Sequence, residues 1–334
     1  MKRIVLPQHI GYRLPFYLAT EEWVAYNLPA DDYFFLWRVH PTVICGRNQD
    51  IPKEVNLQYC AGHGIEVIRR KSGGGCVYAD LNNWMISYIT PGDEVSSTFS
   101  RFTSTIAGML RSLGLDASAT GRNDILISDR KVSGNAFYHV PGRSIVHGTM
   151  LHRIDFAVLS QAITPSKAKL ESKAVKSVQA HVTSLSDEGL TLDVDEFGDF
   201  ANRYLKLGDE DIILTPENIS EIESITEEYY RPEFRWGRHG LPEAQPHTHA
   251  ISRHKRIDGV GEFSIGIDTT PEGAIRSMTI TGDFFVTGDI DRVLIAPLMG
   301  MKYSASTLAK AVDNIRPDTA ISGLSRHDFL SLLI

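Results

Sequence analysis

The chain has 334 residues, of which 42% are hydrophobic, and its formal net charge at pH 7 is -7. This length allows two domains with substantial hydrophobic cores, and the acidic balance argues against general nucleic-acid binding, which needs a basic surface. There are only three cysteines, Cys45, Cys60 and Cys76, and no Cys-x-x-Cys pair, so neither a disulfide framework nor a cysteine zinc site is indicated.

The N-terminal residues contain no apolar stretch long enough for a signal peptide. No window approaches the roughly 20 apolar residues of a membrane span. We therefore expect a cytoplasmic protein with neither a membrane nor a nucleic acid as its partner.

In the first half of the chain, apolar residues at helical spacing predict helices, and aromatic and β-branched runs predict strands. The predicted helices are Leu14–Leu28, ended by Pro29, then Asn56–Cys60, and Phe99–Leu113, ended by Gly114. The predicted strands are Lys2–Leu6, Tyr33–Val39, Thr42–Cys45, Ile65–Arg69 and Trp84–Thr90.

A second group of strands follows. Ile125–Ile127 and Arg130–Asn135 form a predicted hairpin around a turn at Ser128-Asp129, and Arg143–Leu151 is a further strand. The next predicted helices are Asp155–Gln161, a short helical segment near Lys167–Glu171, Asp195–Leu205 and Pro216–Tyr229. Strands and helices do not alternate strictly, so the pattern predicts an α/β (α+β) fold with a mixed or antiparallel sheet.

Beyond Arg231 the chain becomes rich in Gly, Pro and His. The histidines His239, His247, His249 and His254 could hold zinc, but no carboxylate or cysteine stands at ligand spacing, so we predict a polar linker. The strands Glu262–Asp268 and Ile275–Thr281 and the helix Ser306–Ile315 then predict a small α+β domain. We place the domain boundary between residues 245 and 246, which gives domains of 1–245 and 246–334.

The stretch Arg69–Asp80 contains two arginines, a lysine and three consecutive glycines between two strand-like runs. Glycines are costly to order, so three in a row suggest a close approach of backbone to another group. Exposed N–H groups beside cationic side chains favour an anion such as phosphate. The alternative is a mobile hairpin loop with a solvated basic flank. The P-loop fingerprint is absent because no Gly-Lys-Ser/Thr follows the glycines. The dinucleotide fingerprint is absent because Tyr78 stands where a third glycine would be needed.

Arg122-Asn123-Asp124, followed by Lys131 on the neighbouring strand, is a second candidate. A carboxylate and an amide can bind Mg²⁺ with few protein ligands, and lysine is a point charge for a phosphate or carbonyl oxygen. The alternative is a turn rich in Asn and Asp with a solvated lysine.

Two single residues have similar alternatives. His147 could be a catalytic base, but a strand histidine is more often a hydrogen-bonded core residue. Cys76 could be a nucleophile, although a small buried thiol is the plainer interpretation.

Several motifs together resemble the lipoate–protein ligase A family in order and spacing. They are Leu18–Glu22, Val43–Gln49, Arg69–Tyr78, Gly121–Ile125 with Asp129–Phe137, His147–Leu151, and Thr164–Lys167 onward to Lys176–Val178. The resemblance covers residues from about 14 to 185, and it continues more weakly to the C-terminus. It implies a mixed-sheet catalytic core shared with biotin ligases and related to class II aminoacyl-tRNA synthetases.

The resemblance also implies an AMP-forming reaction with ATP, Mg²⁺ and lipoate. Lipoyl-AMP forms first, and the lipoyl group then passes to a lysine of a lipoyl-domain protein, such as an E2 subunit, a glycine-cleavage H protein or a specialised carrier. Lys131 would be the catalytic residue, in contact with the lipoyl carbonyl and the α-phosphate, and Asp124 would be the residue nearest Mg²⁺.

The same resemblance assigns the binding residues. Those for ATP or the adenylate would be Arg70, Gly75, Cys76, Val77, Tyr78, Asn123, Asp124, Lys131, Lys176 and Val178. Those for lipoate would be Trp37, Ser72, Gly73, Gly74, Gly75, Lys131, Gly134, His147 and Gly148. The segment Lys176–His181 would form a loop over the adenine.

The chain departs from the family pattern at four places. Ala79 stands where His is usual, Cys76 where Ala is usual, and Gln179 or His181 where Arg is usual. Two alternatives to a ligase stay open at this point: an ATP-independent octanoyl or lipoyl transferase using a thioester at Cys76, and a non-catalytic module that binds lipoate or an adenylate.

Overall fold

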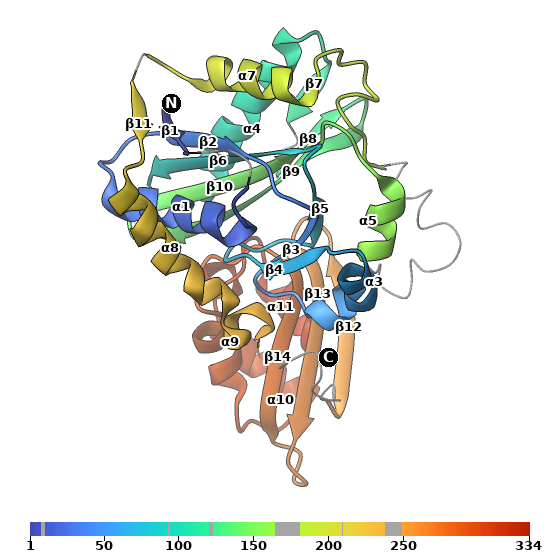
Figure 1. Cartoon of the computed structure of the whole chain (residues 1–334). Helices are drawn as coiled ribbons and strands as arrows, with labels where there is room; N and C mark the ends of the chain where they lie inside the picture. Colours follow the sequence, from blue (N-terminus) through green and yellow to red (C-terminus); the bar gives the residue numbers. More distant parts are fainter. Residues whose placement is uncertain (8–10, 93, 120–122, 164–180, 209, 238–248) are drawn as a thin grey trace. The chain divides into compact units, whose positions relative to one another are not determined.

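The computed structural model describes residues 1–7, 11–92, 94–119, 123–163, 181–208, 210–237 and 249–334. The chain divides into two compact units (Figure 1). The N-terminal unit comprises residues 1–44, 52–69 and 76–235, and the C-terminal unit comprises residues 45–51, 70–75 and 236–334. The glycine-rich stretch is thus shared: Arg70–Gly75 belongs to the C-terminal unit, whereas Arg69 and Cys76 belong to the N-terminal one.

The N-terminal unit is built on a mixed sheet with the strand order β11-β1-β2-β6-β10-β9-β8-β7. Its strands are β1 (Lys2–Val5), β2 (Tyr33–Trp37), β6 (Trp84–Pro91), β7 (Ala117–Ala119), β8 (Asp124–Ile127), β9 (Arg130–Val140), β10 (Arg143–Met150) and β11 (Asp211–Ile213). β1 pairs in parallel with β2 and β11, and the other pairs are antiparallel, which confirms the predicted mixed sheet.

Helices cover both faces of this sheet. Figure 1 shows α1 (Leu14–Asn27) and α8 (Pro216–Tyr230) on one face, and α4 (Val95–Ser112) and α7 (Val194–Leu205) on the other. Every residue of β2 and β10 is buried, because a strand covered on both sides has no solvent face. α1 is buried on nearly all sides between the sheet and α8, so its sequence is apolar around most of its circumference.

A three-stranded sheet with the order β4-β3-β5 lies beside the first. Its strands are β3 (Thr42–Cys45), β4 (Glu66–Arg69) and β5 (Val77–Ala79), and its neighbouring helices are α2 (Ile51–Glu54), α3 (Leu57–Gly62), α5 (Phe156–Ala162) and α9 (Pro232–Arg235). Two reciprocal hydrogen bonds join α9 to β4: Arg69 Nε donates to the carbonyl of Arg235 at 3.1 Å, and Arg235 Nε donates to the carbonyl of Val67 at 2.9 Å.

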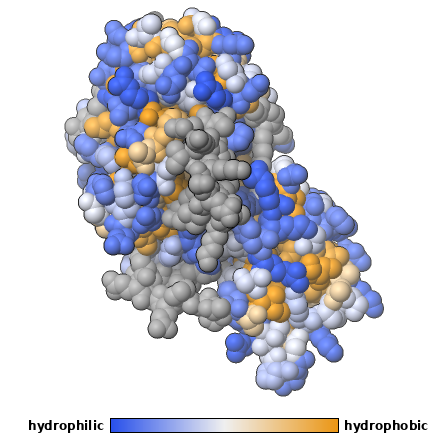
Figure 2. Space-filling view, turned by 90° about the vertical axis from the view of Figure 1, so that its right-hand side faces the viewer, coloured by the Kyte–Doolittle hydropathy of each residue, from blue (hydrophilic) through white to orange (hydrophobic). Residues whose placement is uncertain are grey.

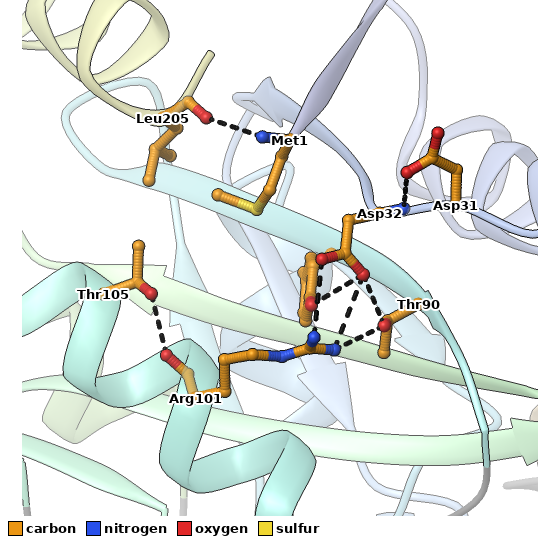
Figure 3. A network of polar contacts seen from close by, with 8 residues as sticks. Met1, Asp31, Asp32, Thr90, Arg101, Thr105 and Leu205 are labelled. Atoms are coloured by element: carbon orange, nitrogen blue, oxygen red, sulfur yellow. Dashed lines mark hydrogen bonds and ion pairs between the residues drawn. The ribbon is translucent and has the colours of Figure 1, made fainter. Parts of the chain in front are cut away.

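A polar network joins the start of β2 to α4 (Figure 3). Asp32 accepts hydrogen bonds from Thr90 at 2.5 Å and from Tyr88 at 3.0 Å, and Arg101 on α4 donates to Thr90 at 2.5 Å. The amino group of Met1 donates to the carbonyl of Leu205 at 3.3 Å, and burial lowers the pKa of this amino group. The contacts of Arg101 fasten α4 to β6 and to the start of β2, and the contact of Met1 fastens the N-terminus to the end of α7.

The C-terminal unit has its own sheet, with the antiparallel order β12-β13-β14. Its elements are β12 (Ile251–Ile257), β13 (Gly261–Thr269), β14 (Ile275–Phe284), η3 (Asp291–Ile295), η4 (Ala296–Leu298), α10 (Ala305–Val312), η5 (Pro317–Thr319) and α11 (Arg326–Leu333). A separate core forms between the sheet and these helices, with Phe263, Phe284 and Phe329 fully buried.

The predicted linker was wrong over its last part. His254 lies in β12, where its ring is hydrogen-bonded to Ser264 at 3.0 Å and to Glu262 at 2.8 Å on the neighbouring strand. His249 is hydrogen-bonded to Asp268 at 3.1 Å and to Thr279 at 3.0 Å. The five central residues of β12 are all polar and all exposed, so the strand lacks the apolar alternation by which a half-buried strand is recognised.

The other predicted elements recur within a few residues, except the helical segment near Lys167–Glu171, which lies outside the described residues. α4 starts at Val95, four residues before the predicted start at Phe99. In the surface of Figure 2, the described residues are mostly hydrophilic, with hydrophobic residues in separate groups. None of the described helices is both long enough and apolar enough to cross a membrane.

Candidate active site

Lys131 lies in the hairpin formed by β8 and β9, next to an irregularity in the strand pairing. Asp124 is opposite Gly134 and Ile125 is opposite Ser133, but Leu126 is opposite Lys131, so β9 carries one extra residue, a β-bulge. With regular pairing Lys131 would lie opposite Ile127 and point to the other face of the sheet. The bulge therefore places the Lys131 side chain on the same face as Asp124 and Gly134.

Contacts on that face agree with this geometry. Lys131 Nζ lies 2.8 Å from Asp124 Oδ1, and the two side chains are 35% and 30% exposed. Gly134 leaves the space in which the lysine lies, because a Cβ there would be 2.5 Å from Lys131 Cε and 2.6 Å from Lys131 Nζ. The result is an ammonium group held in place, yet still accessible to an anionic or carbonyl oxygen.

Asn123 and Asn135 are hydrogen-bonded to each other across the hairpin. Asn135 Nδ2 donates to the carbonyl of Asn123 at 2.7 Å, and Asn123 Nδ2 donates to the carbonyl of Asn135 at 2.9 Å. Asn135 is buried, and a Cβ on Gly148 of the adjacent strand β10 would overlap its side-chain oxygen. Sequence reasoning missed Asn135, although it belongs to the quoted motif Asp129–Phe137. Gly148 is thus needed for close packing within the sheet.

The chain beyond residue 180 returns to the same hairpin. Val182 forms a parallel bridge with Lys131, and Thr183 N donates to the carbonyl of Lys131 at 2.9 Å. Lys176 and Val178, assigned to the adenylate, lie outside the described residues, as does Gln179. His181 is exposed.

A buried polar network extends from His147 on β10. His147 Nδ1 lies 3.0 Å from both carboxylate oxygens of Glu21 on α1, which is fully buried. Ser87 donates to Glu21 at 2.5 Å, and Trp37 Nε1 donates to Ser87 at 2.8 Å. His147 is thus a hydrogen-bonded buried residue. Sequence reasoning missed the role of Glu21, for which the signal was a carboxylate inside an otherwise apolar helix.

Trp37 has no exposed surface. Its ring stacks on Tyr17 with centroids 4.7 Å apart and an interplanar angle of 9°. Trp37 therefore contributes to the core of the N-terminal unit, at the end of the polar network that reaches His147.

The glycine loop, residues 70–75, belongs to the C-terminal unit, and Arg70 organises it from inside. Arg70 is 5% exposed; its Nε donates to Ser72 Oγ at 2.8 Å, and its Nη2 donates to the carbonyls of Gly73 at 2.6 Å and Gly75 at 2.9 Å. Gly74 has a φ of +91°, which side chains rarely adopt. The guanidinium thus fixes the curvature of the loop.

The glycines also let the loop pack closely on β14. Gly74 N donates to the carbonyl of Phe284 at 3.1 Å, and a Cβ on Gly73 would overlap that same carbonyl oxygen. A Cβ on Gly75 would lie 2.7 Å from Asp283 Oδ2. The expected close approach of backbone to another group is therefore observed, and part of it is made by the protein itself.

After the loop, the chain enters β5. Cys76 is in no disulfide and has intermediate exposure, and Ala79 is buried. Burial raises the pKa of Tyr78 above its ordinary value, and the nearby Asp80 adds to the shift. Burial likewise raises the pKa of Asp80, although its carboxylate accepts hydrogen bonds from Asn82 N and Asn83 Nδ2, both at 2.9 Å.

The candidate residues thus form two groups. Asn123, Asp124, Lys131, Gly134 and Gly148 share one hairpin region of the N-terminal unit, and Arg70, Ser72 and the three glycines share the loop of the C-terminal unit. Within the described parts of the chain, no three His, Cys, Asp or Glu side chains come together as a metal site. Mg²⁺ commonly binds through one or two carboxylates together with substrate phosphates, and Asp124 fits that requirement.

Two protein-family models match this chain. Residues 14–206 match the lipoyl protein ligase A/B catalytic domain, and residues 247–333 match the bacterial lipoate protein ligase C-terminus. A lipoate–protein ligase 1 of Staphylococcus aureus is 33% identical over 322 residues, which is 95% of either chain.

Solved structures have the same fold. A bipartite lipoate protein ligase from Thermoplasma acidophilum, solved in a study that includes its E2 lipoyl domain, matches with a TM-score of 0.64 and 25% identity, over 71% of this chain and 96% of that one. LipL1 of P. falciparum, in complex with lipoate, matches with a TM-score of 0.72 and 21% identity, over 99% of this chain and 97% of that one. A lipoate–protein ligase A bound with ATP matches with a TM-score of 0.60 and 24% identity, over 71% of this chain and 98% of that one.

Proposed function

Because the chain belongs to the lipoate–protein ligase family, we propose that it activates lipoate with ATP and transfers the lipoyl group to a lysine of an acceptor protein. In the first step, a lipoate carboxylate oxygen attacks the α-phosphorus of ATP, and pyrophosphate leaves. In the second step, the ε-amine of the acceptor lysine attacks the lipoyl carbonyl; AMP leaves and the amine loses a proton. The products are the lipoyl amide and AMP.

The observation that supports this proposal most directly is the placement of Lys131. Both steps develop negative charge on oxygens next to the reacting atom, so a fixed cation lowers both barriers. The bulge directs Lys131 to the face that also carries Asp124 and Gly134, and its side chain is 35% exposed. Lys131 would leave Asp124 in part and contact the lipoyl carbonyl and the α-phosphate.

We assign the remaining residues as binding groups. The glycine loop shaped by Arg70 and the backbone of Cys76, Val77 and Tyr78 would bind the adenylate, with Lys176 and Val178 at the adenine. Asn123 and Asp124 would face the phosphates, and Mg²⁺ carried by ATP would neutralise the leaving pyrophosphate. For lipoate we assign Ser72–Gly75 of the loop and, in the N-terminal unit, Gly134, His147 and Gly148. Trp37 would act from the core, through the polar network that reaches His147.

The domain assignment is part of the same proposal: residues 1–245 would carry catalysis and 246–334 would form the accessory domain. The acceptor would be a lipoyl-domain protein, namely an E2 subunit, a glycine-cleavage H protein or a specialised carrier. We place the protein in a reducing cytoplasm, and the absence of a disulfide among its three cysteines, all of which the structure describes, is compatible with that.

The test is lipoate-dependent exchange of labelled pyrophosphate into ATP, followed by mass spectrometry of candidate lipoyl domains. A ligase catalyses the exchange without any acceptor, and then increases the mass of the acceptor by one lipoyl group. A thioester transferase or a binding module gives no exchange, so its absence in the folded protein would reject the proposal.

Replacing Cys76 by alanine should change exchange and transfer by less than about threefold, because neither step forms a bond to sulfur. The measurement is both assays on Cys76→Ala beside the parent protein. Cys60→Ala, which removes a thiol elsewhere in the N-terminal unit, is the control. Complete loss of transfer in Cys76→Ala alone would instead favour the thioester route.

Replacing Gly134 by alanine should lower exchange about a hundredfold, because a displacement of about 1 Å at a catalytic group has an effect of that size. The new Cβ would lie 2.5 Å from Lys131 Cε. The lysine side chain can move aside, so the variant should fold normally in a thermal scan. Unchanged exchange would show that the position of Lys131 does not matter for the reaction.

A further inference from the structure

A buried carboxylate that the reaction does not use directly, Glu188, joins the Lys131 hairpin to the chain after residue 180. Its side chain is 8% exposed and lies 2.5 Å from Arg130 Nη2. The same carboxylate oxygen accepts a hydrogen bond from Thr183 Oγ1 at 2.7 Å, and Ser128 Oγ donates to the other oxygen at 3.3 Å. Glu188 therefore binds three residues from two segments more than 50 positions apart.

A tight turn fixes the direction of this side chain. Glu188 N donates to the carbonyl of Ser184 at 3.1 Å, and Leu190 N donates to the carbonyl of Leu185 at 2.9 Å. Gly189, with a φ of +90°, closes the turn, and Leu185 anchors it in the core with no exposed surface. The turn directs Glu188 back to Thr183 and the hairpin.

The segment that Glu188 holds supports the bulge at Lys131. The bulge interrupts regular pairing, so the carbonyls around it need other donors. Thr183 N donates to the carbonyl of Lys131 at 2.9 Å, and Leu151 N donates to that of Val132 at 3.0 Å. Of the residues that flank the bulge, Arg130 is bound by Glu188 directly, and Lys131 through Thr183.

We propose that Glu188 is a positioning residue that keeps the bulge, and with it the ammonium of Lys131, in its reactive orientation. This inference rests on the proposed function. A charge-assisted pair with Arg130 is stronger and more directional than a neutral one, although the Arg130 side chain itself is 39% exposed. Without Glu188 the hairpin could pair regularly, and Lys131 would then point to the opposite face.

The decisive experiment is a double-mutant cycle with Lys131. Glu188→Ala should lower kcat for pyrophosphate exchange about tenfold in the parent protein, and less than about twofold in a Lys131→Ala background. Glu188→Gln, which keeps a hydrogen-bond acceptor, should retain more of the activity. A role in stability alone would give the same factor in both backgrounds, and that result, or full activity in Glu188→Ala, would overturn the inference.

The matched control is Asp211→Asn. Asp211 is bound through two hydrogen bonds from Arg3, at 3.0 Å and 2.5 Å, in β11 at the opposite edge of the same sheet. The Asp211→Asn variant should leave the rate of pyrophosphate exchange unchanged.

Amide hydrogen exchange without substrate separates failure of this inference from failure of the proposed function. In Glu188→Ala the amide of Thr183 should exchange about tenfold faster than in the parent. If Glu188→Ala loses this protection but the parent protein catalyses no pyrophosphate exchange, only the ligase function is refuted. Unchanged protection would refute the role of Glu188, whatever the activity.

Discussion

Lys131→Ala is expected to lower lipoate-dependent pyrophosphate exchange by about a hundred- to a thousandfold, the effect of removing one preorganised group that stabilises developing charge. Lys131 lies 2.8 Å from Asp124, and its side chain is 35% exposed. The alanine variant should therefore fold, with a stability change of about 0.5 kcal/mol or less. The measurement is the exchange rate at saturating lipoate, beside a urea unfolding curve.

The control for this variant is Lys255→Ala, which removes the same charge from an exposed position on β12. It should keep full exchange. Lys131→Arg is informative as well, because a planar guanidinium keeps the charge but cannot occupy the space of an ammonium. Full exchange in Lys131→Ala would remove this lysine from the mechanism.

Gly73→Ala is expected to destabilise the C-terminal unit by about 1–3 kcal/mol, as overpacking of a filled site usually does. The new methyl group would overlap the carbonyl oxygen of Phe284 and lie 3.1 Å from the Cα of Phe285. Both obstacles are backbone atoms, so the loop itself must move. Calorimetry should show a lower unfolding temperature, and exchange should fall because the loop residues assigned to the adenylate are displaced.

Gly62→Ala is the comparison for Gly73→Ala. Gly62 ends the helix α3, its φ is not positive, and a Cβ there would meet no atom within 4 Å. This variant should be neutral, or more stable by up to about 1 kcal/mol, since alanine has the higher helix propensity. A Gly73→Ala protein as stable as Gly62→Ala would contradict the close packing of the loop on β14.

Local order along the chain could be predicted because it depends on residues that are near each other in sequence. The apolar spacing of Leu14–Leu28 and the aromatic run from Tyr33 gave α1 and β2 close to their observed ends. β12 was missed because its exposed face is polar, and β7 and β11 because each has only three residues.

The candidate residues were also available from the sequence, because their motifs are contiguous. Lys131 with Asp124, and Arg70 with the glycines, were identified from order and spacing, and the family assignment follows from the same motifs. Their functional roles stay predictions until the variants above are measured.

The tertiary structure alone decided how these residues are directed. One extra residue in β9 reverses which face Lys131 occupies, and no local pattern signals it. The partners of the glycine loop, Asp283 and Phe284, and the pairing of Glu188 with Arg130 come from distant parts of the chain. The sequence by itself determined most of the elements and the family, and it supplied the candidate reacting groups, because short-range periodicity and motif spacing encode them. The fold decided orientation and support, because these depend on contacts that form only when distant segments pack together.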